Sequence, residues 1–353
     1  MAPSNAPRRA SAAELERFAS ALLGKAGMAA DRAADVASIL VEGDLMGHST
    51  HGLQLLPSYL AEATSGSMTL QGEPVVLADR GASLTWDGRR LPGPWLVLRA
   101  MEEAERRARE FGTGTVVIRR SHHIGCLAAY LRRSSERGFV MLLHSSAPAN
   151  SSVAPHGGTK GVLSPSPISA GIPTEGLPIL VDISTSSTSN GLVGRTKAAG
   201  GRLPHPWLVD AEGRATDDPA KTQTILPLGG LDNGHKGFGL GLMVDALTSG
   251  LAGHGRLKAK ENLGASVFLQ VFDPEGFGGS ADLRKEMQGI VDGCAASPAP
   301  AGGEPVRMPG ERGQKLRERQ LAEGVELLPS IVDGVAAWAA KLGVQMPAGL
   351  AGA

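Results

Sequence analysis

Apolar and polar positions follow two different periods along this chain, and the period changes near residue 70. Over 12–24, 31–45 and 53–63, apolar residues recur every three or four positions, which predicts three amphipathic helices. Ser11 and Glu14 form a capping box at the first helix, and Asp31 is expected to cap the second. Beyond residue 70, short apolar runs alternate with amphipathic stretches. They predict strands at 74–77, 83–86, 115–119, 139–143, 179–182 and 267–272, and helices at 95–110, 126–136, after Gly237, 313–322 and 331–342.

The alternation of strands and helices predicts an α/β protein with a layered sheet. Residues 145–178 and 295–310 are rich in Ser, Pro or Gly and predict irregular connections. No Rossmann fingerprint or P-loop follows a predicted strand, because the glycines at 237, 239 and 241 lack the required third spacing. Any nicotinamide cofactor would therefore bind outside the Rossmann scheme.

Composition excludes several classes of partner. The 353 residues carry 35 basic and 35 acidic side chains, so no net field attracts nucleic acid or an anionic membrane. Two cysteines cannot build a disulfide framework, which favours a reducing, cytoplasmic setting. The first ten residues do not resemble a signal peptide, and no apolar run reaches the ~20 residues of a membrane helix. We expect a cytoplasmic protein with a small-molecule substrate.

Histidines are the clearest candidates for chemistry. His48 and His51 stand in one five-residue window, and His122 and His123 in another that follows a predicted strand, so these windows hold four of the nine histidines. A histidine can give and take a proton near neutral pH. The alternative is a core histidine whose ring nitrogens are satisfied by neighbours. Clustering beside glycines at element boundaries favours a site.

Three further features have both functional and structural interpretations. His48 and His51 have the spacing of zinc ligands on a helix, but no suitably spaced Cys or carboxylate completes the set, so we expect no metal site. Asp182 follows an apolar run and would either cap a turn or helix, or orient a catalytic histidine. Lys236, between glycines at an expected helix start, would hold a phosphate or lie on the surface.

Several motifs together resemble the type-2 malate/L-lactate dehydrogenase family of NAD(P)-dependent oxidoreductases, and within it the hydroxycarboxylate dehydrogenase B branch. The resemblance runs from about Ser11 to Leu342. The motifs that carry it are GHSTHG at 47–52, SHHIG at 121–125, VAPHGG at 153–158, PILVDISTS at 178–186, LGGLDNGHKGFGLGLMVD at 228–245 and RMPGE at 307–311.

The resemblance implies a fold and an assembly. We expect a non-Rossmann, three-layer mixed sheet of the sulfolactate dehydrogenase type, with a helical domain formed by both termini. The expected boundaries are a disordered tail at 1–10, a helical domain at 11–72 plus 305–350, and an NAD(P)-binding domain at 73–304. A homodimer is expected, with each active site completed near the subunit boundary.

The resemblance also implies site residues. His123 is expected to be the acid/base at the substrate oxygen, with Asp182 raising its pKa and His51 as the rival proton donor. The expected cofactor contacts are Asp182, Ile183, Ser184, Lys236, Gly237, Gly310, Glu311 and Arg312, and the expected substrate contacts are His48, Thr50 and His122. The cofactor would be NAD or NADP.

Three departures from the family pattern bear on the substrate. Leu55 stands where many relatives carry a carboxylate-binding arginine, Leu192 replaces a common lysine, and a G-T-N-P turn reads Ser-Pro-Ser-Pro at 164–167. We therefore expect a 2-hydroxy or 2-oxo acid that is bulkier or more apolar than malate. The alternatives are a reductase of cyclic or N-alkyl imino acids on the same scaffold, and a catalytically silent cofactor-binding homologue.

Overall fold

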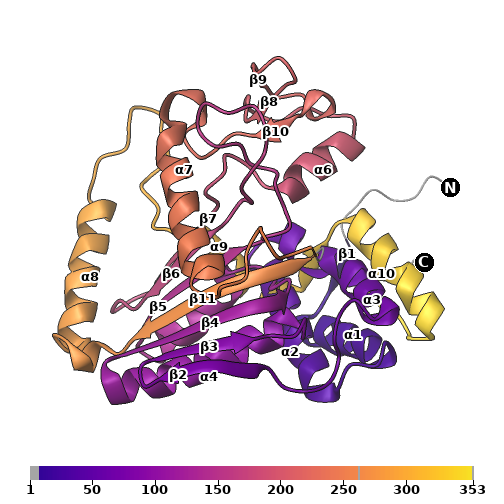
Figure 1. The fold of residues 1–353 in the computed structure, drawn as a ribbon, viewed down its shortest axis with the longest axis horizontal. Coiled ribbons are helices and arrows are strands. Elements are labelled where there is room, and N and C mark those ends of the chain that lie inside the picture. Colours follow the sequence, from indigo (N-terminus) through magenta and orange to yellow (C-terminus); the bar gives the residue numbers. More distant parts are fainter. Residues whose placement is uncertain (1–7, 261–262, 352–353) are drawn as a thin grey trace.

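A seven-stranded mixed sheet forms the centre of the computed structural model, which describes residues 8–260 and 263–351 (Figure 1). In spatial order its strands are β2 (Val75–Arg80), β3 (Ser83–Asp87), β4 (Thr113–His122), β11 (Gly264–Phe272), β5 (Val140–Ser146), β6 (Ile168–Ile172) and β7 (Ile179–Ile183). Only the β3–β4 pair is parallel, and the other neighbours are antiparallel. The expected α/β class with a mixed sheet is confirmed. Strand β6 lies in the stretch that we expected to be irregular.

Both faces of the sheet are covered, which gives three layers. Helices α4 (Gly93–Phe111) and α5 (Ala128–Glu136) pack on one face, where Val116 and Ile118 of β4 are buried. On the other face, Val117 and Phe268 pack against the π-helical segment Ala246–Gly250, which continues α7 (Gly230–Asp245). Successive residues of a strand point to opposite faces, so β4 supplies both cores.

Helices from both ends of the chain share a second core beside the sheet. Its elements are β1 (Arg8–Ala10), α1 (Ala12–Lys25), α2 (Ala30–Leu45), α3 (Leu56–Ser65), β12 (Val325–Leu327) and α10 (Pro329–Leu342), and α9 (Glu311–Glu323) packs on α2. The capping box at Ser11 is confirmed, but α2 has Ala29 as its N-cap residue and Asp31 lies in the first turn. The domain boundaries themselves stay a prediction.

The expected N-terminal tail is wrong for its last three residues. Arg8–Ala10 pair antiparallel with Val325–Leu327, so the start of the described chain is held in a two-stranded sheet. The remainder of that expected tail, 1–7, lies outside the described residues.

A third, smaller unit stands above the sheet (Figure 1). It contains α6 (Asn190–Ala198) and the strands β8 (Leu208–Val209), β9 (Ala215–Thr216) and β10 (Thr224–Ile225), around a small apolar core. These elements were not predicted, because two-residue strands and a helix with no fully buried side chain leave no periodic signal. The same holds for α8 (Ser280–Ala295), which has no buried residue. Among the described residues, no helix is both long and apolar enough to cross a membrane.

Candidate active site

The two histidine windows meet at the end of β4. His123 directly follows β4, and His51 ends a 3-10 turn, Ser49–His51, between α2 and α3. Their rings stack with centroids 6.0 Å apart. Helix α4 also approaches the end of β4 closely: a Cβ on Gly93 would lie 2.3 Å from the carbonyl oxygens of His122 and His123, so only glycine fits there. The two windows therefore lie side by side, which brings His51 and His123 together.

A cavity of about 570 Å³ contains this histidine pair. Its volume lies in the range of small-molecule sites. Of the predicted site residues it brings together His48, Thr50, His51, His123, Asp182 and Ser184. The rest of its lining is rich in hydroxyl groups, from Ser145, Ser146, Ser164, Ser166 and Ser189. No lysine or arginine stands among the described residues that line it, and Leu55 is part of the wall.

His123 is held in one orientation from its Nδ1 side. The Gly125 amide donates to Nδ1 at 3.2 Å, and the Tyr59 hydroxyl lies 2.8 Å from Nδ1 and 2.9 Å from the His123 carbonyl oxygen. Because an amide N–H can only donate, the Gly125 contact makes Nδ1 an acceptor and favours the tautomer with its proton on Nε2, in which the single Tyr59 hydroxyl hydrogen is shared between Nδ1 and the carbonyl oxygen. Burial, together with the nearby His51, lowers the pKa of His123 to about 3. The ring is therefore a neutral N–H donor.

His51 has a more adaptable partner. Its Nδ1 lies 2.9 Å from the Thr50 hydroxyl, which can rotate either to donate or to accept. Burial and then the neighbouring His48 lower the pKa of His51 below its usual value. Both protonation states of His51 keep a hydrogen bond at Nδ1, whereas protonating Nδ1 of His123 would oppose the Gly125 amide.

Asp182 does not pair with His123 as expected. Its Oδ2 accepts from the Ala128 amide at the start of α5, at 2.9 Å, and faces the Cys126 thiol at 3.8 Å. Burial raises the pKa of Asp182, and His48 is the histidine that counteracts this effect. Asp182 is therefore a helix cap supplied by a distant strand, and its histidine neighbour is His48 rather than His123.

A second cavity, of about 760 Å³, adjoins the first. His48 and Asp182 line both cavities, and Gly310, Arg312 and Arg307 line the second. Gly310 has φ 82° and begins α9, and its Cα approaches β7 so closely that a Cβ would lie 2.6 Å from Leu180. Two of the predicted cofactor contacts thus lie beside the histidine site.

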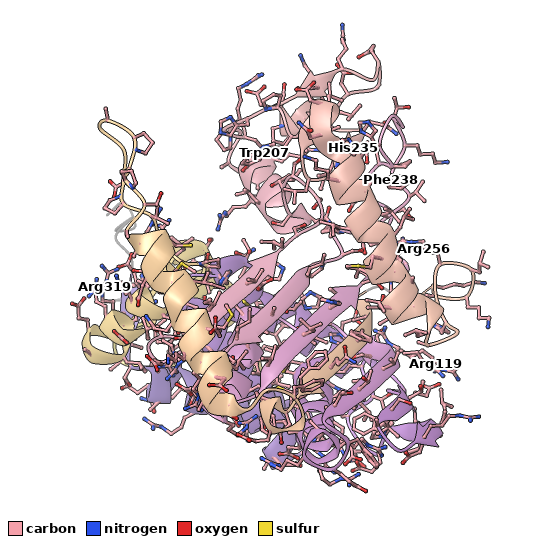
Figure 2. All side chains as sticks on the ribbon, turned by 90° about the vertical axis from the view of Figure 1, so that its left-hand side faces the viewer. Arg119, Trp207, His235, Phe238, Arg256 and Arg319 are labelled. Atoms are coloured by element: carbon pink, nitrogen blue, oxygen red, sulfur yellow. The ribbon has the colours of Figure 1, made fainter. Side chains whose placement is uncertain are left out.

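The other predicted cofactor contacts are not brought together there. Ile183 is 44% exposed, and Glu311 binds the Met308 amide and Lys315. Lys236 and Gly237 lie within α7 rather than at its start, and the Gly237 amide donates to the Leu228 carbonyl. Figure 2 shows that this end of α7, marked by His235 and Phe238, stands away from the large sheet beside Trp207. Lys236 does not stand at a helix start as expected, because α7 begins at Gly230.

His122 is not a substrate contact within the described chain. Its side chain is fully buried, packs edge-on against Tyr59, and lines neither of the two cavities. Neither ring nitrogen has a hydrogen-bond partner among the described residues, although Nε2 lies 3.9 Å from Glu62 Oε2. Burial, with His123 and Arg90, lowers its pKa to about 3. His122 is a neutral core residue behind the active ring.

Sequence reasoning missed two residues that shape the site. Tyr59 binds His123, but at the sequence level it reads as an apolar position of an amphipathic helix. Gly93 allows α4 to touch the end of β4, but one glycine in a glycine-rich chain gives no signal.

Comparisons with known proteins show the family to which the chain belongs. A family model described as malate/L-lactate dehydrogenase matches residues 10–336. A (2R)-3-sulfolactate dehydrogenase (NADP(+)) from Chromohalobacter salexigens is 34% identical, covering 94% of this chain and 98% of the relative. Hydroxycarboxylate dehydrogenase B from Escherichia coli strain K12 is 28% identical, covering 90% of each. The structure of a delta1-piperideine-2-carboxylate reductase from Pseudomonas syringae superposes with a TM-score of 0.82 at 26% identity, covering 94% of this chain and 99% of that one.

The matched family model and the full-length relatives define the chain as a hydroxyacid dehydrogenase. It belongs to the malate/L-lactate dehydrogenase family. The resemblance seen in the histidine and glycine motifs is confirmed, and hydroxycarboxylate dehydrogenase B is among its relatives.

Proposed function

We propose that this protein oxidises a 2-hydroxy acid, or reduces the corresponding 2-oxo acid, with NAD or NADP as the hydride carrier. The observation that carries the proposal is the stacked pair of His51 and His123 in one wall of a substrate-sized cavity. The cavity adjoins a second one at His48 and Asp182. An oxygen bound between the two rings would meet a fixed donor and a group able to carry a proton.

The residues around the second cavity fit a nicotinamide dinucleotide. Arg307 and Arg312 offer positive charge for phosphates, and the start of α9 at Gly310 presents backbone amides. Ser184 and Asp182 would hold the part that reaches the main cavity. When bound, this group accepts or supplies the hydride.

His123 would hold the substrate oxygen without changing its charge. Its Nε2–H is directed by the Gly125 and Tyr59 contacts on the other ring nitrogen. A preorganised neutral donor stabilises the negative charge that develops on a carbonyl oxygen during reduction. We therefore assign His123 to orientation and charge stabilisation.

His51 would carry the proton, in preference to His123. Neutral His51 takes the hydroxyl proton during oxidation, and protonated His51 returns it during reduction. The Thr50 hydroxyl can rotate to accommodate either state. Of the two proton donors that the family resemblance implied, His123 and His51, the geometry thus favours His51.

The substrate carboxylate would be held without a cationic side chain from the described lining. Leu55 occupies the wall, and Leu192 packs in the core of the small unit. Ser189, Asn190 and Gly191 bring the start of α6 to the cavity, where a helix N-terminus favours an anion. This lining favours a monocarboxylate with an apolar substituent over a dicarboxylate.

The test is a steady-state comparison of NADH and NADPH with pyruvate, oxaloacetate and phenylpyruvate. Turnover of a 2-oxo acid, with monocarboxylates preferred, supports the proposal. Fluorescence-detected cofactor binding without oxidation across the whole panel supports the silent homologue instead.

A second candidate is reduction of cyclic or N-alkyl imino acids. It is favoured by the full-length similarity to a structure described as a delta1-piperideine-2-carboxylate reductase. Hydride delivery to C=N needs a similar geometry. Turnover of a 2-oxo acid only when methylamine is added would select this candidate.

We further propose a cytoplasmic homodimer. Both cysteines are free, as expected in a reducing compartment. Helix α7 exposes the apolar side chains of Leu231, Leu242 and Met243, which a partner subunit would cover. Sedimentation equilibrium tests the dimer, and a monomer at micromolar concentration would contradict it.

A further inference from the structure

Three side chains able to bind a cation meet where the two cavities adjoin: His48, Cys126 and Asp182. One ligand atom from each lies within 4.8 Å of the others. They come from three segments, since His48 follows α2, Cys126 precedes α5 and Asp182 is on β7. All three line the main cavity. Spacing along the chain predicted no metal site because no suitably spaced Cys or carboxylate completed the set with His48, and the fold brings one of each from distant segments.

The observed separations suit a small cation of tetrahedral preference. Cys126 Sγ and Asp182 Oδ2 are 3.8 Å apart. Zinc bonds of about 2.3 Å to sulfur and about 2.0 Å to oxygen, at tetrahedral angles, place the two ligand atoms about 3.5 Å apart. The widest pair in the cluster, at most 4.8 Å apart, must close by up to about 1.3 Å to reach such distances. Side-chain rotation at the partly exposed His48 can supply that movement.

The electrostatics of the cluster also favour a cation. Two acidic groups, the Cys126 thiol and the Asp182 carboxyl, face each other at 3.8 Å. A bound divalent cation would stabilise both ionised forms at once.

We propose that His48, Cys126 and Asp182 form a binding site for a borderline-soft divalent cation, Zn²⁺ above all. Thiolate and imidazole ligands favour Zn²⁺ over the hard ions Mg²⁺ and Ca²⁺. Three protein ligands leave the fourth coordination position open toward the main cavity. The site shares Asp182 with the proposed cofactor contacts, but it goes beyond the proposed dehydrogenase activity and does not depend on it.

Cobalt(II) titration of the full-length, chelator-treated protein tests this site directly. The wild type is expected to bind one Co²⁺ per chain, with a thiolate-to-cobalt charge-transfer band and the intense visible bands of tetrahedral cobalt. One equivalent of Zn²⁺ should abolish both. Cys126→Ser should lose the charge-transfer band, whereas Cys294→Ser, which alters the other free cysteine, should keep it.

Zinc affinity, measured by competition with a chromophoric chelator, gives a second readout. Loss of a group that only supports a metal ligand costs about 10- to 100-fold in affinity, so losing the ligand itself in Cys126→Ser or His48→Asn should cost at least about 10-fold. Circular dichroism verifies that each variant is folded. If Cys126→Ser does not fold, His48→Asn still tests the site. A wild type without the charge-transfer band, or two folded variants with wild-type zinc affinity, would overturn the proposal. None of these readouts uses enzymatic turnover, so failure of the proposed activity is distinguishable.

Discussion

Replacing Tyr59 by phenylalanine tests the support behind His123. The Tyr59 hydroxyl is buried and lies 2.8 Å from His123 Nδ1 and 2.9 Å from its carbonyl oxygen. Leaving buried acceptors unsatisfied costs about 1–3 kcal/mol. The Gly125 amide still reaches Nδ1, so we expect a loss of about 1.4 kcal/mol in transition-state stabilisation, which is about tenfold in turnover.

Tyr130→Phe is the matched control. Tyr130 is also buried and donates to the carbonyl of Ile124, so its variant loses a comparable hydrogen bond without touching a histidine. Urea unfolding should show similar losses of stability for both variants. Steady-state kinetics should show kcat and kcat/KM falling together only for Tyr59→Phe, as expected when an interaction of the transition state is lost. Equal turnover in the two variants would refute a positioning role for Tyr59.

Three further predictions follow from burial and close contacts. Because the folded pKa of His122 is about 3 and the unfolded value is about 6.5, the folded state gains stability that is complete above pH 6.5 and is lost as the pH falls toward 3. In denaturant unfolding, His122→Leu should reduce the slope of the unfolding free energy against pH in this range by up to about 1.4 kcal/mol per pH unit. An unchanged slope would contradict this assignment. Leu55→Arg should raise kcat/KM for oxaloacetate relative to pyruvate by about tenfold or more, because the new guanidinium in the cavity wall would face the second carboxylate of oxaloacetate. An unaltered ratio would place that carboxylate elsewhere in the cavity. Gly93→Ala should lower the free energy of unfolding by about 1–3 kcal/mol in thermal unfolding, because the new Cβ would meet carbonyl oxygens at 2.3 Å. The control Gly24→Ala, whose Cβ would have nothing within 4 Å, should raise it by up to about 1 kcal/mol. Equal effects of the two variants would contradict the close approach at Gly93.

Local patterns predicted the elements well wherever a face is buried. The capping box at Ser11 and the apolar face of α1 gave the first helix, and the apolar run before the second histidine window gave β4. Helix α8 has no buried residue, and the strands of the small unit are only two residues long, too short to show a period although Leu208 and Val209 are buried. The elements that escaped prediction are mostly those too short or too exposed to show an apolar period in the sequence.

Several residues that line the main cavity were predicted from the sequence, but their pairings were not. His51, His123 and Asp182 all reach the main cavity. Which carboxylate faces which ring depends on how β7 meets α5, and the contact of Asp182 with Cys126 joins positions 56 residues apart. Adjacent histidines also behave differently, because His122 ends β4 inside the core, whereas His123 lies beyond the strand, where the chain turns at Gly125, and lines the main cavity.

The central claim is that His51 carries the proton and His123 holds the substrate oxygen as a neutral donor. The pH profile of kcat/KM for 2-hydroxy acid oxidation tests it, with chelator present, in the wild type, His51→Asn and His123→Asn. Because oxidation needs neutral His51, the wild-type rate should rise through a pKa below the usual 6.5 and then level off. We predict that His51→Asn loses this acidic limb, while His123→Asn keeps it at a rate about 100-fold lower. A limb that persists in His51→Asn and vanishes in His123→Asn would contradict the account.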